Sequence, residues 1–347
     1  YLLQGDGLPL GLWYSHLYAR DPAEHGAAQE RKQLPIEEKE SHRWLEAYLR
    51  ACQLKELCPQ VTVISMGDRE ADIYEIFDLH QQKKSRREPL AQWIIRSNQN
   101  RCLQSTEEID DPQIGKIHEH IQQAPVLGKQ TVSFRAKKQF KKVKGNRQMS
   151  WRTAREAELE IRVAQVELKP PFRPGRKLQP IKVCVVLAQE INPPAKEEPI
   201  LWILLTSLKV KTLKKALRVL QLYCLRWQIE VFHKILKSGC QVEKSQLKKA
   251  NRLLPRIALQ MIIAWRIHYL TVLGRTCPEI PCGTVFEPCE WKPVVVILCG
   301  KGAEKNEPSL SQMMHFIGRL GGHLNRKSDG DPGPQTLWRG LQRVFDF

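Results

Sequence analysis

The stretch YCLRWQIEVFHKILK, residues 223–237, carries a polar stripe and an apolar stripe at helical spacing. At about 100° per residue, Arg226, Glu230 and Lys237 fall close to Tyr223, and His233 and Lys234 border them. The apolar side chains from Leu225 to Leu236 occupy the opposite side. The spacing predicts one long helix from about Thr212 through Lys237 that presents a phenol, a guanidinium, a carboxylate and ammonium groups together.

The single carboxylate of this stripe, Glu230, stands among several cations. Nearby positive charges favour its ionised form, which could bind a divalent metal ion while the cations hold phosphate groups. Such a combination suits metal-assisted chemistry on a phosphodiester. An ordinary solvated helix face is amphipathic too, and the pattern alone leaves that interpretation open.

A second carboxylate is needed, because two-metal sites bridge ions about 4 Å apart through shared oxygen ligands. Asp68 is the candidate. It follows VTVISM, residues 61–66, a short β-branched run that ends at Gly67, and α/β sheets place ligands beyond their strand ends. Asp68 could equally be the N-cap of the helix that we expect to start there. Glu70 and Asp72 would suit the first turn of that helix better, where acidic residues favour the dipole.

Strand and helix patterns alternate on both sides of Asp68. Residues 37–52 have helical spacing with Trp44, Leu45, Tyr48 and Leu49 on one side, and QWIIRS, residues 92–97, is typical of a strand. This order predicts a layered α/β core. The opening YLLQGDGLPLGLWYSHLYA predicts two strands around a turn, in which Asp6 between two glycines is a turn residue.

The rest of the chain divides by its periodicity. Between residues 131 and 207 the period is two, which predicts four strands, and residues 135–155 hold nine Lys or Arg and no acid. From about Leu253 the pattern is mostly helical, with a Cys/Pro/Gly-rich connection after the first helix. We expect four segments: residues 1–130 and 208–250 for the core, 131–207 for a β-rich basic insertion, and 251–347 for a helical domain.

Composition points to an acidic partner. In 347 residues, 55 Lys and Arg against 37 Asp and Glu give a net charge of +18, which is typical of nucleic-acid binding, although a basic surface can also serve solubility alone. No apolar run reaches the roughly 18 residues that span a bilayer, since even LLPRIALQMIIAW contains Arg256. We therefore expect no membrane partner.

The ten cysteines are scattered, and most lie in apolar runs, which suits free thiols in a reducing cytoplasm. The spacings of Cys277, Cys282, Cys289 and Cys299 fit no zinc motif.

At this point a family resemblance becomes visible. Tyr223, Arg226, Glu230 and Lys237 reproduce the Tyr-x2-Arg-x3-Glu-x6-Lys signature of the bacterial insertion-sequence-4 family of transposases. GDREADIYEIF, residues 67–77, resembles the second-aspartate segment of that family. Further segments look like counterparts in transposon-5 transposases, so that the resemblance covers essentially the whole chain: EKESHRWL, IIRSNQ, AQEINPP, LWILLTS and RLGGHLNRK.

The resemblance implies an α/β fold: an RNase H-like (integrase-type) catalytic core, interrupted by a β-rich insertion and followed by an α-helical dimerisation segment. Asp68 and Glu230 would be the second and third acidic ligands of a DDE triad that binds Mg²⁺, or Mn²⁺. The implied contacts to DNA phosphates and to the transposon end are Tyr223, Arg226 and Lys237, with Arg96, Lys234 and His233 as further contacts.

Two further sets of residues are expected to meet DNA. Trp202 matches a family tryptophan on which a flipped base stacks, and core packing within its strand is the alternative. Lys137, Lys138, Lys141 and Lys142 of the basic insertion should contact phosphates without regard to sequence.

The implied function is cut-and-paste transposition in the bacterial cytoplasm, at the nucleoid. A homodimer would hold the double-stranded transposon ends in a synaptic complex, cleave them and join them to target DNA. The family's first aspartate would fall upstream of Tyr1, so we also expect the chain to be N-terminally truncated. The alternative function is therefore a catalytically dead remnant that binds DNA, dimerises and inhibits the full-length protein. Metal-dependent cleavage distinguishes the two.

Overall fold

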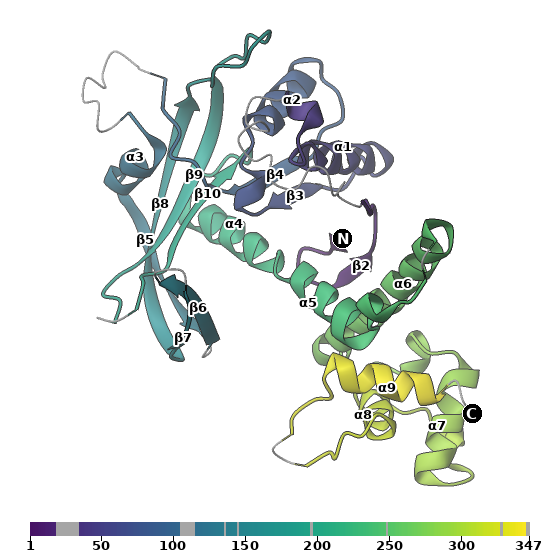
Figure 1. The fold of residues 1–347 in the computed structure, drawn as a ribbon. Coiled ribbons are helices and arrows are strands. Elements are labelled where there is room, and N and C mark those ends of the chain that lie inside the picture. Colours follow the sequence, from purple (N-terminus) through teal and green to yellow (C-terminus); the bar gives the residue numbers. More distant parts are fainter. Residues whose placement is uncertain are drawn as a thin grey trace. The chain divides into compact units, whose positions relative to one another are not determined.

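The computed structural model describes residues 1–18, 35–104, 115–134, 137–143, 146–194, 197–247, 249–326 and 329–344. The chain forms two compact units, which are described separately (Figure 1). We call Asp21–Cys224 the sheet unit. Tyr1–Arg20 and Leu225–Phe347 together make the helical unit.

The sheet unit contains a mixed six-stranded sheet in the order β3-β4-β10-β9-β8-β5. Its strands are β3 (Ile64–Gly67), β4 (Gln92–Arg96), β5 (Val126–Phe134), β8 (Arg155–Leu168), β9 (Ile181–Glu190) and β10 (Leu201–Thr206). Strands β3 and β4 are parallel and every other neighbouring pair is antiparallel. The predicted strands are confirmed, and those of residues 131–207 continue the sheet that β3 and β4 begin.

Helices cover both faces of this sheet (Figure 1). They are α1 (His42–Leu57), α2 (Tyr74–Ser85), α3 (Ile117–Gln123) and α4 (Leu213–Leu225). Alternate residues of β4 serve the two faces: Trp93 and Ile95 pack into the cluster with α1, α2 and α3, and Ile94 packs with α4. This period-two alternation is that of a strand buried on both sides. On α1, Tyr48 is buried, whereas Leu49, which helical spacing puts on the same side, is exposed.

The basic segment of the sheet unit forms a separate two-stranded hairpin. Strand β6 (Lys137–Val143) pairs antiparallel with β7 (Asn146–Arg152), and Lys138 lies opposite Trp151. The sequence left a hairpin and a loop open for this segment, and the structure shows the hairpin. All four lysines expected to contact phosphates lie on β6; their side chains lie outside the described part of the structure.

The helical unit begins with the predicted hairpin. Strands β1 (Leu2–Leu3) and β2 (Pro9–Gly11) pair antiparallel, and Asp6 Oδ1 accepts the backbone N–H of Leu8 within the turn. The helices of this unit are α5 (Gln228–Lys234), α6 (Ala250–Thr276), α7 (Pro288–Cys299), α8 (Leu310–Leu320) and α9 (Pro334–Val344). Their apolar sides share one core, which includes Met313 and Met314.

Several short helices connect these elements. They are the 3₁₀ helices η3 (Ile36–Glu38), η4 (Arg69–Ala71), η6 (Val242–Lys244), η7 (Cys282–Thr284) and η8 (Ala303–Lys305), and the π-helix η5 (Ile235–Gly239). In the Cys/Pro/Gly-rich stretch the structure places α7, where the sequence predicted only a connection. A reciprocal capping box between Glu287 and Glu290, with Pro288 at the first helical position, explains why this helix forms.

Helix α6 corrects the expectation about apolar runs. Among the described residues it is the one helix long and apolar enough to cross a membrane, judged by length and composition alone. Its second half packs Ala264, Ile267 and Leu270 into the core of the helical unit, as a core helix of a soluble protein also would. The charge of Arg256 therefore does not lower the mean hydropathy enough to exclude a span.

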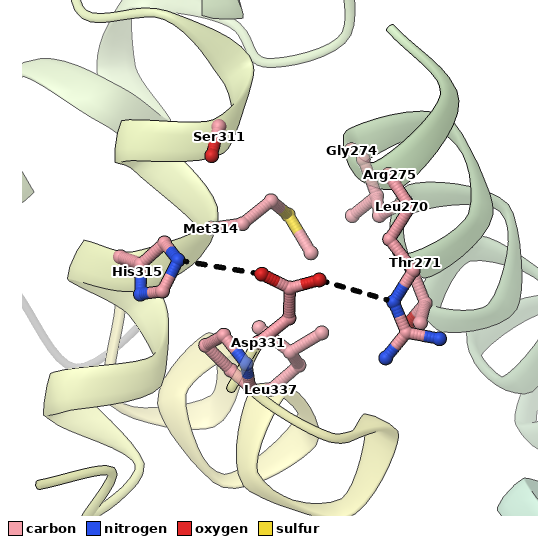
Figure 2. A pocket seen from close by; sticks show the side chains of 10 residues that line it. Leu270, Thr271, Gly274, Arg275, Ser311, Met314, His315, Asp331 and Leu337 are labelled. Carbon is pink, nitrogen blue, oxygen red and sulfur yellow. Dashed lines mark ion pairs between the residues drawn. The ribbon is translucent and has the colours of Figure 1, made fainter. Parts of the chain in front are cut away.

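Asp331 links two helices of this unit (Figure 2). Its two carboxylate oxygens lie 3.5 Å from Arg275 Nε on α6 and 3.7 Å from His315 Nε2 on α8. The three side chains border a small cavity of about 20 Å³, which has space for little more than one water molecule. The cluster therefore ties the loop before α9 to α6 and α8.

Candidate active site

Asp68 follows the end of β3, at a turn that depends on Gly67. A Cβ on Gly67 would lie 2.3 Å from Ala71 Cβ, so only glycine lets η4 fold back this closely onto the strand end. Asp68 Oδ1 accepts the backbone N–H of Glu70 at 2.9 Å and caps η4. Oδ2 of the same carboxylate accepts no hydrogen bond from the described residues, and the side chain is partly exposed. Capping therefore occupies one oxygen and leaves the other for a ligand.

The helix expected to start at Asp68 does not. The 3₁₀ helix η4 intervenes, and α2 begins only at Tyr74, so the prediction that Asp72 lies in its first turn is wrong. Asp72 is instead buried and pairs with Arg101, with Oδ1 2.7 Å from Arg101 Nη2. Its Oδ2 accepts the backbone N–H groups of Asn98 and Gln99 at 2.8 Å each. Asp72 thus fixes the loop after β4, a role that sequence reasoning missed because its partners lie 26–29 residues away.

Arg96 ends β4, at the same edge of the sheet as Asp68. In the parallel pair, Gly67 lies opposite Ile95, so Asp68 and Arg96 each follow one residue later on neighbouring strands. Arg96 Nη2 donates to the carbonyl oxygen of Leu201 at 3.3 Å. Asp68 and Arg96 therefore lie at the same end of two neighbouring strands. Whether Arg96 contacts DNA stays a prediction.

Trp202 and Tyr223 lie together on the other side of the sheet unit. Their ring centroids are 6.1 Å apart at an interplanar angle of 68°, an edge-to-face contact. Tyr223 is 6% exposed and belongs to the cluster between α4 and the sheet, against which the partly buried Trp202 packs. Both side chains therefore contribute to packing, and base stacking on Trp202 stays a prediction.

The continuous helix predicted from Thr212 through Lys237 is wrong. Helix α4 ends at Leu225, a turn occupies Arg226 and Trp227, and α5 covers only seven residues before the π-helix η5. A π-helix turns less per residue than an α-helix, so the 100° spacing that aligned Lys237 with Glu230 does not hold. Tyr223 belongs to the sheet unit, and Arg226, Glu230 and Lys237 belong to the helical unit.

Glu230 lies in the first turn of α5 and pairs with Arg226, four residues before it. Arg226 Nη2 donates to Glu230 Oε1 at 2.9 Å, and the glutamate side chain is 40% exposed. Such an exposed pair adds little stability, about 0–1 kcal/mol, but it orients the carboxylate. Of the described residues, none donates a hydrogen bond to Oε2, which leaves that oxygen available to a cation.

The remaining cations of the signature are exposed. His233, Lys234 and Lys237 all lie on the surface of the helical unit, and Lys237 Nζ is 3.2 Å from Glu243 Oε1. Desolvation and the Lys237 charge lower the pKa of His233 below its ordinary value. This shift favours the neutral form of the imidazole in the protein without DNA.

Helix α5 is held by a chain of partly buried polar groups that the sequence did not indicate. His268 on α6 donates from Nε2 to Gln228 Oε1 at 2.9 Å and accepts from the Tyr1 hydroxyl on Nδ1 at 2.6 Å. Tyr1 also packs on Phe232, with ring centroids 4.8 Å apart. The start of the helix that carries Glu230 is thus fixed by α6 and by the opening hairpin.

The predicted site residues fall into local groups. Asp68 lies with Arg96, Trp202 lies with Tyr223, and Arg226 lies with Glu230. Asp68 belongs to the sheet unit and Glu230 to the helical unit. No group of three His, Cys, Asp or Glu able to hold a metal ion occurs among the described residues, and all ten cysteines are free.

Two protein-family models match the chain. Residues 46–266, more than half of the sequence, match the family described as Transposase DDE domain. Residues 262–347 match the family described as Transposase Tn5 dimerisation domain. The first match includes Asp68, Glu230 and the six-stranded sheet, and the second includes α7, α8 and α9.

Proposed function

The chain belongs to the DDE transposase domain family, and we propose that it is a cut-and-paste DNA transposase that uses Asp68 and Glu230 as catalytic carboxylates. A DDE domain implies phosphoryl transfer on DNA and an RNase H-like core. The finer assignment is that β3, β4 and α4 belong to this core and that residues 131–207 are an insertion into it. The observation that carries the proposal is that one family match contains both carboxylates and the complete Tyr-Arg-Glu-Lys signature.

The two carboxylates suit Mg²⁺ or Mn²⁺. Asp68 keeps Oδ2 and Glu230 keeps Oε2 without a hydrogen bond from the described residues, and hard divalent cations prefer such carboxylate oxygens. A bound cation would lower the pKa of a water molecule and stabilise charge on the phosphate. The chain's own contribution is orientation: η4 fixes Asp68, and Arg226 together with the Gln228–His268 pair fixes Glu230.

The reaction that we propose is a series of displacements at phosphorus. Water attacks the phosphodiester at the transposon end and the 3′ oxygen leaves. The freed 3′-OH attacks a phosphodiester of the opposite strand, which forms a hairpin and releases the flanking DNA with a 3′-OH of its own. A second water then opens the hairpin and regenerates the 3′-OH of the transposon end. This 3′-OH attacks a phosphodiester of the target DNA and displaces a 3′ oxygen of the target strand. Arg226, Lys234 and Lys237 would hold backbone phosphates, and the β6 lysines would add contacts that are independent of sequence.

A homodimer is the form in which we expect the protein to act. The match to a transposase dimerisation domain over residues 262–347 supports this assembly. A dimer would bring two transposon ends together, and the proposed location of this assembly is the bacterial nucleoid.

The test compares DNA cleavage with DNA binding. The assays use the full-length protein. Glu230→Ala should remove detectable Mg²⁺-dependent cleavage of end DNA while the affinity in a mobility-shift assay stays within about threefold, because Glu230 contributes a metal ligand rather than a phosphate contact. The matched control, Glu56→Ala on the exposed side of α1, should cleave like the wild type.

The outcomes separate the two functions. Cleavage by Glu230→Ala at the wild-type rate would refute its role as a ligand. A wild-type protein that binds end DNA and leaves it intact in Mg²⁺ and in Mn²⁺ would favour the inhibitory remnant instead.

A further inference from the structure

The largest cavity described here has a volume of about 380 Å³ and lies entirely within the sheet unit. Its wall is built by η3, η4, the first turn of α2, the loop after β4 and the loop between β8 and β9. It therefore lies beside the carboxyl ends of the parallel strands β3 and β4, where open α/β sheets bind ligands. Asp68 does not line it, although the next two residues, Arg69 and Glu70, do.

The wall of this cavity is strongly charged, with five Lys or Arg and four carboxylates. Asp72 is fully engaged with Arg101 and two backbone N–H groups, and Glu37 pairs with Arg176 at the surface. Arg69 on η4 is exposed and forms no ion pair with the described residues. The rim thus offers Arg69 to an anionic group, and Arg176, which also pairs with Glu37, is exposed beside it.

Glu75, in the same wall, needs a hydrogen-bond donor. Its side chain is 5% exposed, and Oε1 accepts from Arg173 Nε at 2.6 Å. Oε2 is buried and has no hydrogen-bond partner. A buried carboxylate oxygen without a donor is unfavourable, and an N–H group of a ligand would satisfy it.

The rest of the wall suits a flat ring. Ile36, Ile73 and Pro174 provide apolar contacts, while the amides of Asn98 and Gln99 can read a polar edge. A metal ion is a poor match, because no cluster of three possible ligands occurs among the described residues. The requirements are therefore an anion at the rim, apolar faces, and an N–H donor directed at a carboxylate.

We infer that this cavity binds a nucleoside monophosphate unit whose base carries an amino group. The phosphate would lie between Arg69 and Arg176, and the amino group of adenine, cytosine or guanine would donate to Glu75 Oε2. Thymine is disfavoured, since its only N–H lies between two carbonyl oxygens that a carboxylate repels. The unit could be a free nucleotide or an unpaired nucleotide of a DNA strand. The inference does not depend on transposase activity.

Calorimetric titration of the intact chain tests this, with dCMP, dGMP, dTMP and inorganic phosphate as ligands. We expect dCMP or dGMP to bind about tenfold more tightly than dTMP and than phosphate, because a site built around a hydrogen bond rejects ligands that leave it unpaired. Equal affinities for dCMP, dGMP and dTMP, equal affinity for phosphate, or no binding at all would overturn the inference. A trinucleotide with central dC that binds more tightly than dCMP would identify DNA as the source, and weaker binding would identify free nucleotides.

Variants locate the site. Glu75→Gln should abolish the preference for dCMP or dGMP over dTMP. Arg69→Ala should weaken the binding of every nucleotide by a similar factor of about three to ten. Exposed α1 residues give the matched controls, Glu56→Gln and Arg50→Ala, which should bind like the wild type. If circular dichroism shows that Glu75→Gln does not fold, the nucleotide affinity of Arg69→Ala still tests the inference, because Arg69 lies at the exposed rim. Unchanged binding by Arg69→Ala would refute the phosphate position.

Discussion

The hydrogen-bonded chain Tyr1–His268–Gln228 should make the helical unit sensitive to acid. His268 is 1% exposed, and burial lowers its pKa from 6.5 to about 4. In its neutral form Nε2 donates to Gln228 and Nδ1 accepts from Tyr1. Burial also raises the pKa of the Tyr1 hydroxyl, which therefore remains a donor. Protonation of Nδ1 would remove the acceptor and leave a charge inside the core.

The sign and size of this pH effect on stability follow from the pKa values of His268 in the unfolded and the folded chain. As the pH falls, the unfolded chain binds a proton near 6.5, and the folded unit binds it only near 4. The stabilisation is therefore fully present above pH 6.5 and is lost as the pH falls toward 4. Integration over this window gives a loss of about 3 kcal/mol in the free energy of unfolding between pH 7 and pH 4.

Urea unfolding, followed by circular dichroism from pH 7 to pH 4, measures this loss. His268→Gln cannot titrate, so its stability should fall by about 3 kcal/mol less than that of the wild type over the same window. The control His120→Gln, on the partly exposed α3, should keep the wild-type dependence. His80→Gln should reduce the loss of stability of the sheet unit between pH 7 and pH 4 by a similar amount, because burial lowers the pKa of His80 to about 4 as well. Parallel curves for His268→Gln and the wild type would refute the reasoning.

Two further predictions concern the strand end and the hairpin. Gly67→Ala should lower the stability of the sheet unit by about 1–3 kcal/mol, because the added Cβ would lie 2.3 Å from Ala71 Cβ. The control Gly333→Ala should have little effect, because a Cβ there would meet open space. Equal melting temperatures for the two variants would contradict this prediction. Replacing Lys137, Lys138, Lys141 and Lys142 by alanine should reduce the slope of log affinity against log salt by about 3 to 4, while replacement by arginine should preserve it. An unchanged slope in the alanine variant would show that β6 does not contact phosphates.

Periodicity predicted the sheet unit well, because burial on a strand repeats every two residues regardless of its partners. Trp93, Ile94 and Ile95 alternate between the two faces of the sheet as their strand pattern requires. The turn at Asp6 was predictable for a similar reason, since its side chain bonds only two residues away. Features that depend on neighbouring residues alone could thus be predicted from the sequence.

Roles that depend on distant partners could not. Asp72 has the local signature of a first-turn residue, yet Arg101 and the loop after β4 decide its position. Gln228 looks like an ordinary polar helix residue, and only His268, 40 residues later, shows that it holds α5 in place. No spacing rule connects such pairs in a single sequence, so the roles of Asp72 and Gln228 were missed.

The break between α4 and α5 matters most for the interpretation of the signature. No glycine or proline lies between Tyr223 and Lys237, so propensity gave no reason to expect a turn at Arg226 and Trp227. The structure nevertheless places Tyr223 in the sheet unit and Glu230 in the helical unit. The four signature residues therefore do not form one stripe on a straight helix. Their fixed spacing instead marks the short connection between the two units, where Tyr223 anchors one end and the Arg226–Glu230 pair begins the other.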